Sequence, residues 1–371
     1  MPKLANLNES DGILSFTMSD VNVSVVNSLR RIIMSEIPAI VIHTFPDEEN
    51  ELNITVNTTR LTNEQIKQRV GAIPIHIKDQ TIDLADYQVE LDMANTSDNI
   101  IYATTEHLKI KKLSSDKYLD DSELRKVFQA DKMTGGFIPI VRLRPRINAE
   151  TKGEQIKFTA KMSIKTGKDS GMYVSAHTIS YGFTPDKLRQ VEEWTKTEKE
   201  LVKTMKPEDV ELEKQNWMAS QGKRITLDNS FDFMVGSVGV YDNVELIKKA
   251  CEIMNNKLSS VVAAIDGNEL KIQDAKTTTP HCFDILYNGE DYTLSNVIDS
   301  VLYSDYYHSN DKLSYIATKK LHPHNDYIVM RLAIKHDDAI KEDQYSGIAK
   351  NYIKEACVKG IQIVNEIVDL F

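Results

Sequence analysis

The sequence predicts an α+β fold in which two similar modules pair by pseudo-twofold symmetry and the first module is split by a mostly β insert. Two observations carry this prediction. Strand-like and amphipathic helical stretches follow one another in the same order near both ends of the chain, and the middle contains mainly alternating, strand-like stretches. The chain has 371 residues, of which 41% are hydrophobic and 27% charged, so it can bury several small cores.

Two helices are expected in the N-terminal part. The first opens at Asn22 and ends at Pro38, because proline cannot continue a helix. One face of this helix is apolar and consists of Val25, Val26, Leu29, Ile32 and Ile33. The second, shorter helix follows Thr62, since Thr62 and Gln65 have the spacing of a capping box, and Gly71 is its expected end.

The middle of the chain predicts strands followed by helices. Alternation of apolar and polar residues marks strands at 87–93, 107–111, 137–144 and 155–166, with a short helix at 120–130 between them. A further helix is expected to begin at Thr184 and Pro185, because threonine is a good N-cap and proline suits the first helical position. It extends to about Met205, and most of its Lys- and Glu-rich surface should face solvent. A strand at 231–241 and a long helix at 243–265 follow.

The C-terminal part predicts a shorter unit after a polar linker at 266–280. Its elements are a strand at 282–287, a helix at 293–302, strands at 313–319 and 326–334, and a long helix at 347–371. In this unit, as in the N-terminal module, a strand and a long amphipathic helix follow a shorter helix, and we interpret the order of both as strand, helix, strand, helix. Aligning Asn27 with Asn296 pairs the first helices, and aligning Asp232 with Asp326 pairs the later strands.

The spacing of these landmarks differs between the two copies in one place. Asn27 and Asp232 are 232 − 27 = 205 residues apart, whereas Asn296 and Asp326 are 30 apart, so an insertion of about 175 residues follows the first helix. The expected domains are 1–44 with 226–270, the insert 45–225, and 281–371. If the copies pair, we expect the interface to contain Ile247, Cys251, Met254, Leu258, Val261, Leu294, Asn296, Ile353, Cys357, Ile361 and Val364. The alternative is that each long helix packs only on its own sheet.

Composition excludes several classes of function. Lys+Arg 45 against Asp+Glu 55 gives a net charge of −10, which argues against direct DNA contact. No segment has the roughly 20 apolar residues of a membrane span, and the first ten residues lack the apolar core of a signal peptide. Three cysteines without CxxC spacing predict neither zinc nor disulfides, no cofactor is expected, and a reducing intracellular compartment fits best.

No motif requires catalysis. Phosphate-binding glycine loops, a GxSxG turn and a DxDxD cluster of the kind that holds magnesium for phosphoryl chemistry are all absent from the sequence. The alternative function is a stand-alone α+β enzyme that uses His281, His322 and His324, and a third possibility is a general protein-interaction scaffold. Poor ligand spacing argues against a metal at these histidines.

Arginines form the concentrated positive sites. Arg142, Arg144 and Arg146 alternate and would share one face of a strand, where they either face solvent or dock on an acidic partner surface. Arg30 and Arg31 lie on the first helix.

Two stretches near the N-terminus resemble the N-terminal domain of the RNA polymerase alpha family, which includes the third-largest subunit of eukaryotic polymerase II and the archaeal D family. They are residues 27–38 (NSLRRIIMSEIP) and 57–75 (NTTRLTNEQIKQRVGAIPI), and residues 233–240 and 243–265 match the family's closing strand and dimerisation helix. The last ninety residues resemble the small partner, the eleventh subunit of polymerase II or the archaeal L family, through EDYTLSNV at 290–297 and KLHP at 320–323. Tyr292 and Ser295 replace that family's usual His and Gly.

The resemblance implies a fused, non-catalytic assembly platform of a DNA-directed RNA polymerase. Asn27, Arg30 and Arg31 would contact the second-largest subunit, the C-terminal copy would face the largest subunit, and small zinc-binding subunits would dock beside the first copy. Large DNA viruses encode such fusions, which implies a viral polymerase in the nucleus, cytoplasm, viral factory or virion. The insert has no cysteine, so the family's zinc or iron–sulfur sites are not expected.

Overall fold

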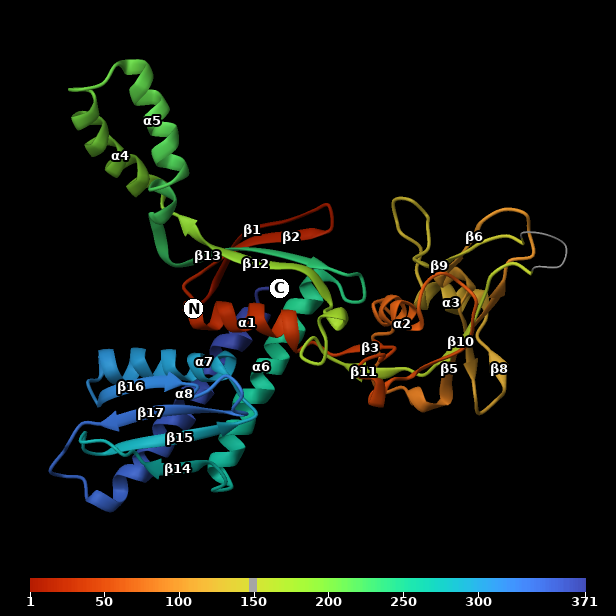
Figure 1. The fold of residues 1–371 in the computed structure, drawn as a ribbon. Coiled ribbons are helices and arrows are strands. Elements are labelled where there is room, and N and C mark those ends of the chain that lie inside the picture. Colours follow the sequence, from red (N-terminus) through yellow and green to blue (C-terminus); the bar gives the residue numbers. More distant parts are fainter. Residues whose placement is uncertain (147–151) are drawn as a thin grey trace. The chain divides into compact units, whose positions relative to one another are not determined.

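The computed structural model describes residues 1–146 and 152–371 (Figure 1). Its mixture of helices and antiparallel sheets confirms the expected α+β class. The chain forms two compact units: residues 1–32, 178–236 and 247–371 make the first, and residues 33–177 and 237–246 make the second. In the described part of the chain, no helix is long and apolar enough to cross a membrane.

The first unit contains a four-stranded antiparallel sheet built from both ends of the first module. Its strands are β1 (Lys3–Ser10), β2 (Ile13–Ser19), β13 (Thr226–Ser237) and β12 (Ala176–Pro185), in the order β1-β2-β13-β12. Helix α1 (Val23–Ser35) follows β2, and helix α6 (Asn243–Asp266) follows β13. Strand β2 alternates between buried and half-buried residues, so one face of it, including Phe16, packs into the core.

A second four-stranded sheet in the same unit has the same plan. Its strands are β14 (Lys271–Asp274), β15 (Cys282–Asn288), β17 (Tyr327–Ile334) and β16 (Leu313–Lys319), in the order β14-β15-β17-β16. Helix α7 (Tyr292–Leu302) follows β15 and runs into a π-helical turn at Tyr303–Ser309, and helix α8 (Tyr345–Val368) follows β17. The segment 266–280 was expected to be a linker, but it contains strand β14. These residues form a strand although their sequence is polar, because their backbone pairs with β15.

The two repeats can be aligned residue by residue from their strand and helix boundaries. Strands β2 and β15 start 282 − 13 = 269 residues apart, and helices α1 and α7 start 292 − 23 = 269 apart, as do Asn27 and Asn296. Phe233 pairs with Phe16 on β2, and Met330 pairs with Ile285 on β15. Phe233 therefore corresponds to Met330, and the sequence alignment of Asp232 with Asp326 is wrong by three residues, an odd shift that would exchange the two faces of the strand.

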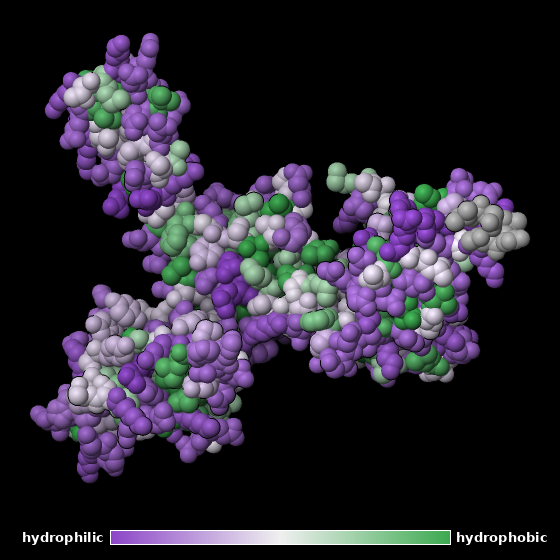
Figure 2. All heavy atoms as spheres, viewed as in Figure 1, coloured by the Kyte–Doolittle hydropathy of each residue, from purple (hydrophilic) through white to green (hydrophobic). Residues whose placement is uncertain are grey.

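The chain leaves the first sheet twice rather than once. Residues 36–175 lie between α1 and β12, and residues 186–225, with helices α4 (Lys187–Leu201) and α5 (Pro207–Ala219), lie between β12 and β13. Thr184 and Pro185 end β12 instead of starting a helix, because the Thr184 hydroxyl bonds Asp232 and Ser230 of the neighbouring strand. The side chain of Asp186 caps α4 by accepting a hydrogen bond from the Arg189 N–H. Figure 2 shows mainly hydrophilic residues on α4 and α5, as the sequence predicted for the first of these helices.

The second unit is mostly β. Its five-stranded sheet has the order β4-β10-β5-β7-β8, with β4 (Leu52–Asn57), β10 (Gln155–Ala160), β5 (Tyr87–Ala94), β7 (Lys109–Lys112) and β8 (Lys117–Tyr118). Two ribbons pair β3 (Ala39–Val41) with β11 (Ser163–Lys165) and β6 (Ile101–Thr104) with β9 (Pro139–Leu143). Helices α2 (Asn63–Gly71) and α3 (Asp121–Val127) complete it. The capping box of Thr62 and Gln65 is confirmed, and Ile66 and Val70 of α2 are buried in the core.

Candidate functional site

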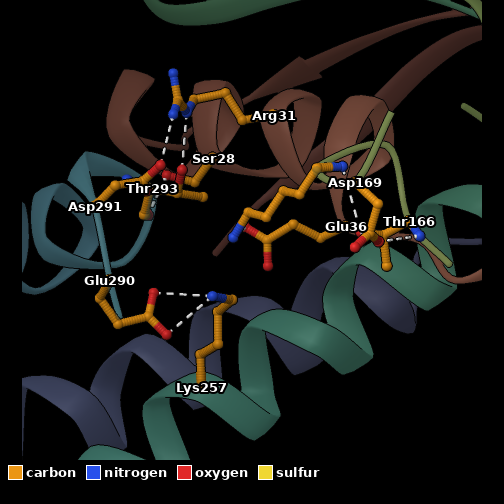
Figure 3. A network of polar contacts seen from close by, with 10 residues as sticks. Ser28, Arg31, Glu36, Thr166, Asp169, Lys257, Glu290, Asp291 and Thr293 are labelled. Atoms are coloured by element: carbon orange, nitrogen blue, oxygen red, sulfur yellow. Dashed lines mark hydrogen bonds and ion pairs between the residues drawn. The ribbon is translucent and has the colours of Figure 1, made fainter. Parts of the chain in front are cut away.

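The first helix of each repeat contacts the other repeat through polar side chains that are buried or partly buried (Figure 3). The Ser28 hydroxyl of α1 donates to the backbone carbonyl of Thr293 on α7 at 2.6 Å, and both residues are almost fully buried. Arg31, one turn further along α1, donates to the Thr293 hydroxyl and to the Asp291 carboxylate, each at 2.8 Å. Arg31 therefore binds the second repeat of its own chain.

Asp291 has two roles at this contact. Its carboxylate caps α7 by accepting the Thr293 N–H at 2.8 Å, and it also accepts from Arg31. Burial alone would raise the pKa of Asp291, but the hydrogen bonds from Thr293 and the Arg31 charge outweigh burial and hold that pKa below its usual value. The ion pair is thus tied to the start of the helix that makes the contact.

The long helix α6 contacts the second repeat at Glu290, just before α7, and along α8. Lys257 of α6 donates to both carboxylate oxygens of Glu290 at 2.9 and 2.8 Å, and both side chains are largely buried (Figure 3). The Asn255 amide donates to the Asn365 side chain of α8 at 2.7 Å. Further contacts join the end of α6 to α8: Lys354 to Asp266, and Lys350 to Asn268.

Apolar packing accompanies these polar contacts. Gly360 of α8 is buried, and a Cβ atom there would come 3.1 Å from Leu258 of α6 and 3.7 Å from Val297 of α7. The Phe371 ring at the end of the chain meets Phe16 of the first sheet edge to face, with centroids 5.0 Å apart. The following expected interface residues are buried: Ile247, Cys251, Met254, Leu258, Val261, Leu294, Ile353, Cys357 and Val364; Asn296 and Ile361 are half-buried.

Two grooves with matching linings lie where each repeat meets the other. One, of about 260 Å³, lies between Glu290 and Leu294 of the second repeat and Lys257 of α6. The other, of about 400 Å³, lies between Val21 and Val25 of the first repeat and residues 359–366 of α8. With the 269-residue offset, Val21 corresponds to Glu290 and Val25 to Leu294. Each groove therefore joins the first-helix region of one repeat to the long helix of the other.

Asn27 and Arg30 stand apart from this junction. The Arg30 guanidinium Nε donates to the Asn27 side chain at 3.1 Å within α1, and both residues are half-buried. The sequence predicted that Asn27, Arg30 and Arg31 contact one partner together, whereas in the structure Arg31 bonds Thr293 and Asp291 of the second repeat. Ser28, Lys257, Glu290, Asp291 and Thr293 were not among the expected site residues; the available signal was an acidic pair, Glu290 and Asp291, at a predicted helix start.

The histidines of the alternative enzyme hypothesis have different neighbours. His281 stacks on Tyr345 and contacts His336 at 2.9 Å, whereas the ring of His322 contacts that of His324. Among the described residues, no group of three or more His, Cys, Asp or Glu side chains has the arrangement to hold a metal ion. Among the contacts described, His281 therefore shares none with His322 or His324.

All three cysteines, Cys251, Cys282 and Cys357, are free and buried. Burial raises the pKa of Cys251 and of Cys357 to about 12. Thiols of this kind pack as small apolar groups, which is the role expected for the two helix cysteines.

Residues 15–258 match the family described as the RNA polymerase Rpb3/Rpb11 dimerisation domain. DNA-directed RNA polymerase subunit Rpo3 of Pyrococcus horikoshii is 23% identical over 278 residues, 69% of this chain and 95% of the relative. Subunit Rpo3 of Pyrococcus furiosus is 22% identical over 280 residues, 70% of this chain and 95% of the relative. DNA-directed RNA polymerases IV and V subunit 3B of Arabidopsis thaliana is 25% identical over 192 residues, 47% of this chain and 55% of the relative.

Proposed function

The chain belongs to the family of the RNA polymerase Rpb3/Rpb11 dimerisation domain, and from this membership we propose that it is a non-catalytic assembly subunit of a DNA-directed RNA polymerase. The relatives described as polymerase subunit 3 support this role. In this role the protein binds other subunits and contributes no reacting group. The large catalytic subunits are its partners.

The observation that carries the proposal is the contact between the two repeats. The family match ends at residue 258, and the second repeat, with the same strand order as the first, follows it in the same chain. Ser28 and Arg31 of the first repeat bind Thr293 and Asp291 of the second. These contacts support the proposal that the second repeat takes the place of a separate dimerisation partner and that the chain is a fusion of a subunit-3-like and a subunit-11-like module.

The matching grooves support a pseudo-twofold arrangement of the two modules. In both, the first-helix region of one repeat faces the long helix of the other. A twofold interface is self-complementary, so a contact made by one copy recurs with the roles of the copies exchanged. The alternative, in which each long helix packs only on its own sheet, does not account for the contacts between α6 and α8.

Two half-buried polar residues of α1 are the proposed contact with the second-largest subunit. Asn27 and Arg30 keep this assignment, and Arg31 acts at the internal junction. The second repeat faces the largest subunit, and small zinc-binding subunits dock beside the first. The net charge of −10 fits an assembly role with little or no direct DNA contact.

The proposed domains are residues 1–44 with 226–270, the insert 45–225, and 281–371. Strand β12 pairs in the first sheet, so within the insert residues 176–185 belong structurally to the first module. A fused subunit of this kind fits a large DNA virus, and the free cysteines fit a reducing intracellular compartment.

Co-purification tests the proposal. A tagged chain expressed in its natural setting should recover both large polymerase subunits, identified by mass spectrometry, in equal amounts. Arg30→Glu should reduce recovery of the second-largest subunit, whereas Lys199→Glu, an exposed residue of α4 with the same change in charge, should not. Recovery of no polymerase subunit would refute the assembly role, and equal recovery with both variants would refute the Arg30 contact.

A further inference from the structure

The second unit contains an arginine-lined pocket that the assembly role does not use. The pocket has a volume of about 330 Å³ and lies beside α2 and the β6–β9 ribbon. Its charged residues are Arg60, Arg69, Arg142, Arg144 and Glu154. Four guanidinium groups and one carboxylate give 4 − 1 = +3, in a chain whose net charge is −10.

Strand geometry and one helix bring the arginines together. Arg142 and Arg144 are two residues apart on and just after β9, so they share a face of that strand, as the sequence predicted. Arg69 of α2 is fixed against the same strand, because its guanidinium donates to the backbone carbonyls of Ile140 and Pro139 at 2.7 and 2.6 Å. Arg146, the third arginine of the expected face, instead pairs with Asp98 at 3.0 Å and does not line the pocket.

The single acidic residue of the pocket, Glu154, is already paired with Arg144. Glu154 accepts from the Arg144 backbone at 2.7 Å and from its guanidinium at 2.6 Å. Burial opposes ionisation of Glu154, but the Arg144 hydrogen bonds, with the charges of Arg144 and Arg60, keep its pKa below the usual value. Arg60 and Arg142 form no ion pair with any other described residue, so both guanidinium groups can donate hydrogen bonds to an incoming anion.

The lining also contains apolar surface. Leu61, Tyr102 and Val141 border the pocket, and Tyr102 is directly opposite Arg142 in the β6–β9 register. Arginine forks match carboxylates in geometry, and apolar surface beside them accepts an aliphatic or aromatic side chain. Nucleic acid requires an extended basic track for successive phosphates, whereas the basic residues here line a single half-open pocket of about 330 Å³.

We propose that this pocket binds an acidic segment of a partner protein, with carboxylates at Arg60 and Arg142 and a neighbouring apolar side chain against Leu61 and Tyr102. The occupant's recognition element is an acidic residue next to an aliphatic or aromatic one. The proposal uses only contacts inside residues 33–177 and therefore stands independently of the assembly role.

Fluorescence anisotropy on the full chain tests the site with a labelled peptide of alternating glutamate and leucine or phenylalanine. Arg60→Ala with Arg142→Ala should weaken peptide binding about tenfold or more, because two charge-assisted contacts are lost. The matched control, Arg125→Ala with Arg146→Ala, removes the same charge from surface pairs with Glu106 and Asp98 and should change binding less than about twofold. Thermal unfolding of both variants shows whether the fold is retained.

Three outcomes would overturn the proposal. One is equal weakening in both double variants, which would indicate non-specific attraction to positive charge. Another is equal binding of a peptide in which glutamine replaces every glutamate, because the carboxylates would then be irrelevant. The last is tighter, Arg60- and Arg142-dependent binding of a labelled oligothymidylate, which would make the pocket a nucleic-acid site.

Discussion

Gly360 of α8 lies so close to Leu258 of α6 that a Cβ atom on the glycine would come 3.1 Å from the leucine Cδ1. Leu258 is fully buried, so it has little room to move away. The close approach of the two long helices therefore depends on the missing side chain at position 360. Gly347, in the first turn of the same helix, is exposed, and beyond its chain neighbours and the nearby helix backbone no heavy atom lies within 4 Å of its Cβ position.

This pair of glycines gives a matched stability test. Gly360→Leu should destabilise the protein by about 1–3 kcal/mol, because the added side chain overpacks the α6–α8 contact. Gly347→Leu should be neutral or slightly stabilising, since leucine is a better helix former than glycine and meets open space. Urea denaturation measures both. A Gly360→Leu protein as stable as the Gly347→Leu protein would contradict the packing described for α6 and α8.

The neighbouring arginines of α1 should differ in effect. Arg31→Met should lower the free energy of unfolding by about 1 kcal/mol, because it removes hydrogen bonds to Thr293 and Asp291 at a partly exposed site. Arg30→Met should change stability by less than about 0.5 kcal/mol, since Arg30 bonds only within its own helix among the contacts described. Denaturation curves of the two variants compare them directly, and equal losses of stability would contradict the distinction between Arg31, which bonds the second repeat, and Arg30, which bonds within α1.

The Asp291 carboxylate predicts a dependence of stability on pH. Its pKa in the folded chain lies below the ordinary value of 3.8, so its ionised form stabilises the fold above that value. The contribution falls as pH drops through 3.8 toward the folded-state pKa. Asp291→Asn keeps a capping side chain but cannot form the ion pair. The stability difference between the wild type and this variant should therefore be largest near neutral pH and shrink below about pH 4. A difference that stays constant across this range would exclude an electrostatic role.

The helix cysteines should resist modification in the folded protein. Cys251 and Cys357 are fully buried and their pKa values are raised to about 12, so at pH 8 neither supplies an accessible thiolate. Cys282, at 7% exposure the least buried of the three, should react first with a disulfide-forming thiol reagent. The helix thiols should react only at the rate of unfolding, and all three should react at once in denaturant. Rapid native-state labelling of Cys251 or Cys357 would contradict the burial of these thiols on α6 and α8.

Long, strongly periodic elements were predicted from the sequence, and elements defined by their partners were not. The helices at 243–265 and 347–371 appear within two or three residues as α6 and α8, since a continuous apolar stripe marks each of them. Strand β14 was missed because it contains a single apolar residue, Ile272, and owes its conformation to pairing with β15. The helix expected at Thr184 was displaced because bonds from Thr184 to β13 extend the strand β12.

For the candidate site, the buried apolar residues were predicted from the sequence, whereas the polar contacts between the repeats were not. Burial of the stripe residues follows from periodicity, which one sequence reveals. The pairing of Arg31 with Asp291 depends on how two helices cross, and residues 260 apart carry no local signal of that crossing. Likewise, the role of Gly360 comes from a neighbour on another helix and cannot be inferred from the α8 sequence alone.

Cleavage between the repeats tests the central claim most directly. A protease site inserted between Asn268 and Glu269, both exposed, separates α6 from β14, so no backbone pairing within either sheet spans the cut. After cleavage of the folded chain, the two pieces should elute together in size-exclusion chromatography at the volume of the uncut protein. Gly360→Leu should promote their separation, and Gly347→Leu should not. Pieces that separate immediately after cleavage of the unmodified protein would show that the repeats are joined only by the polypeptide.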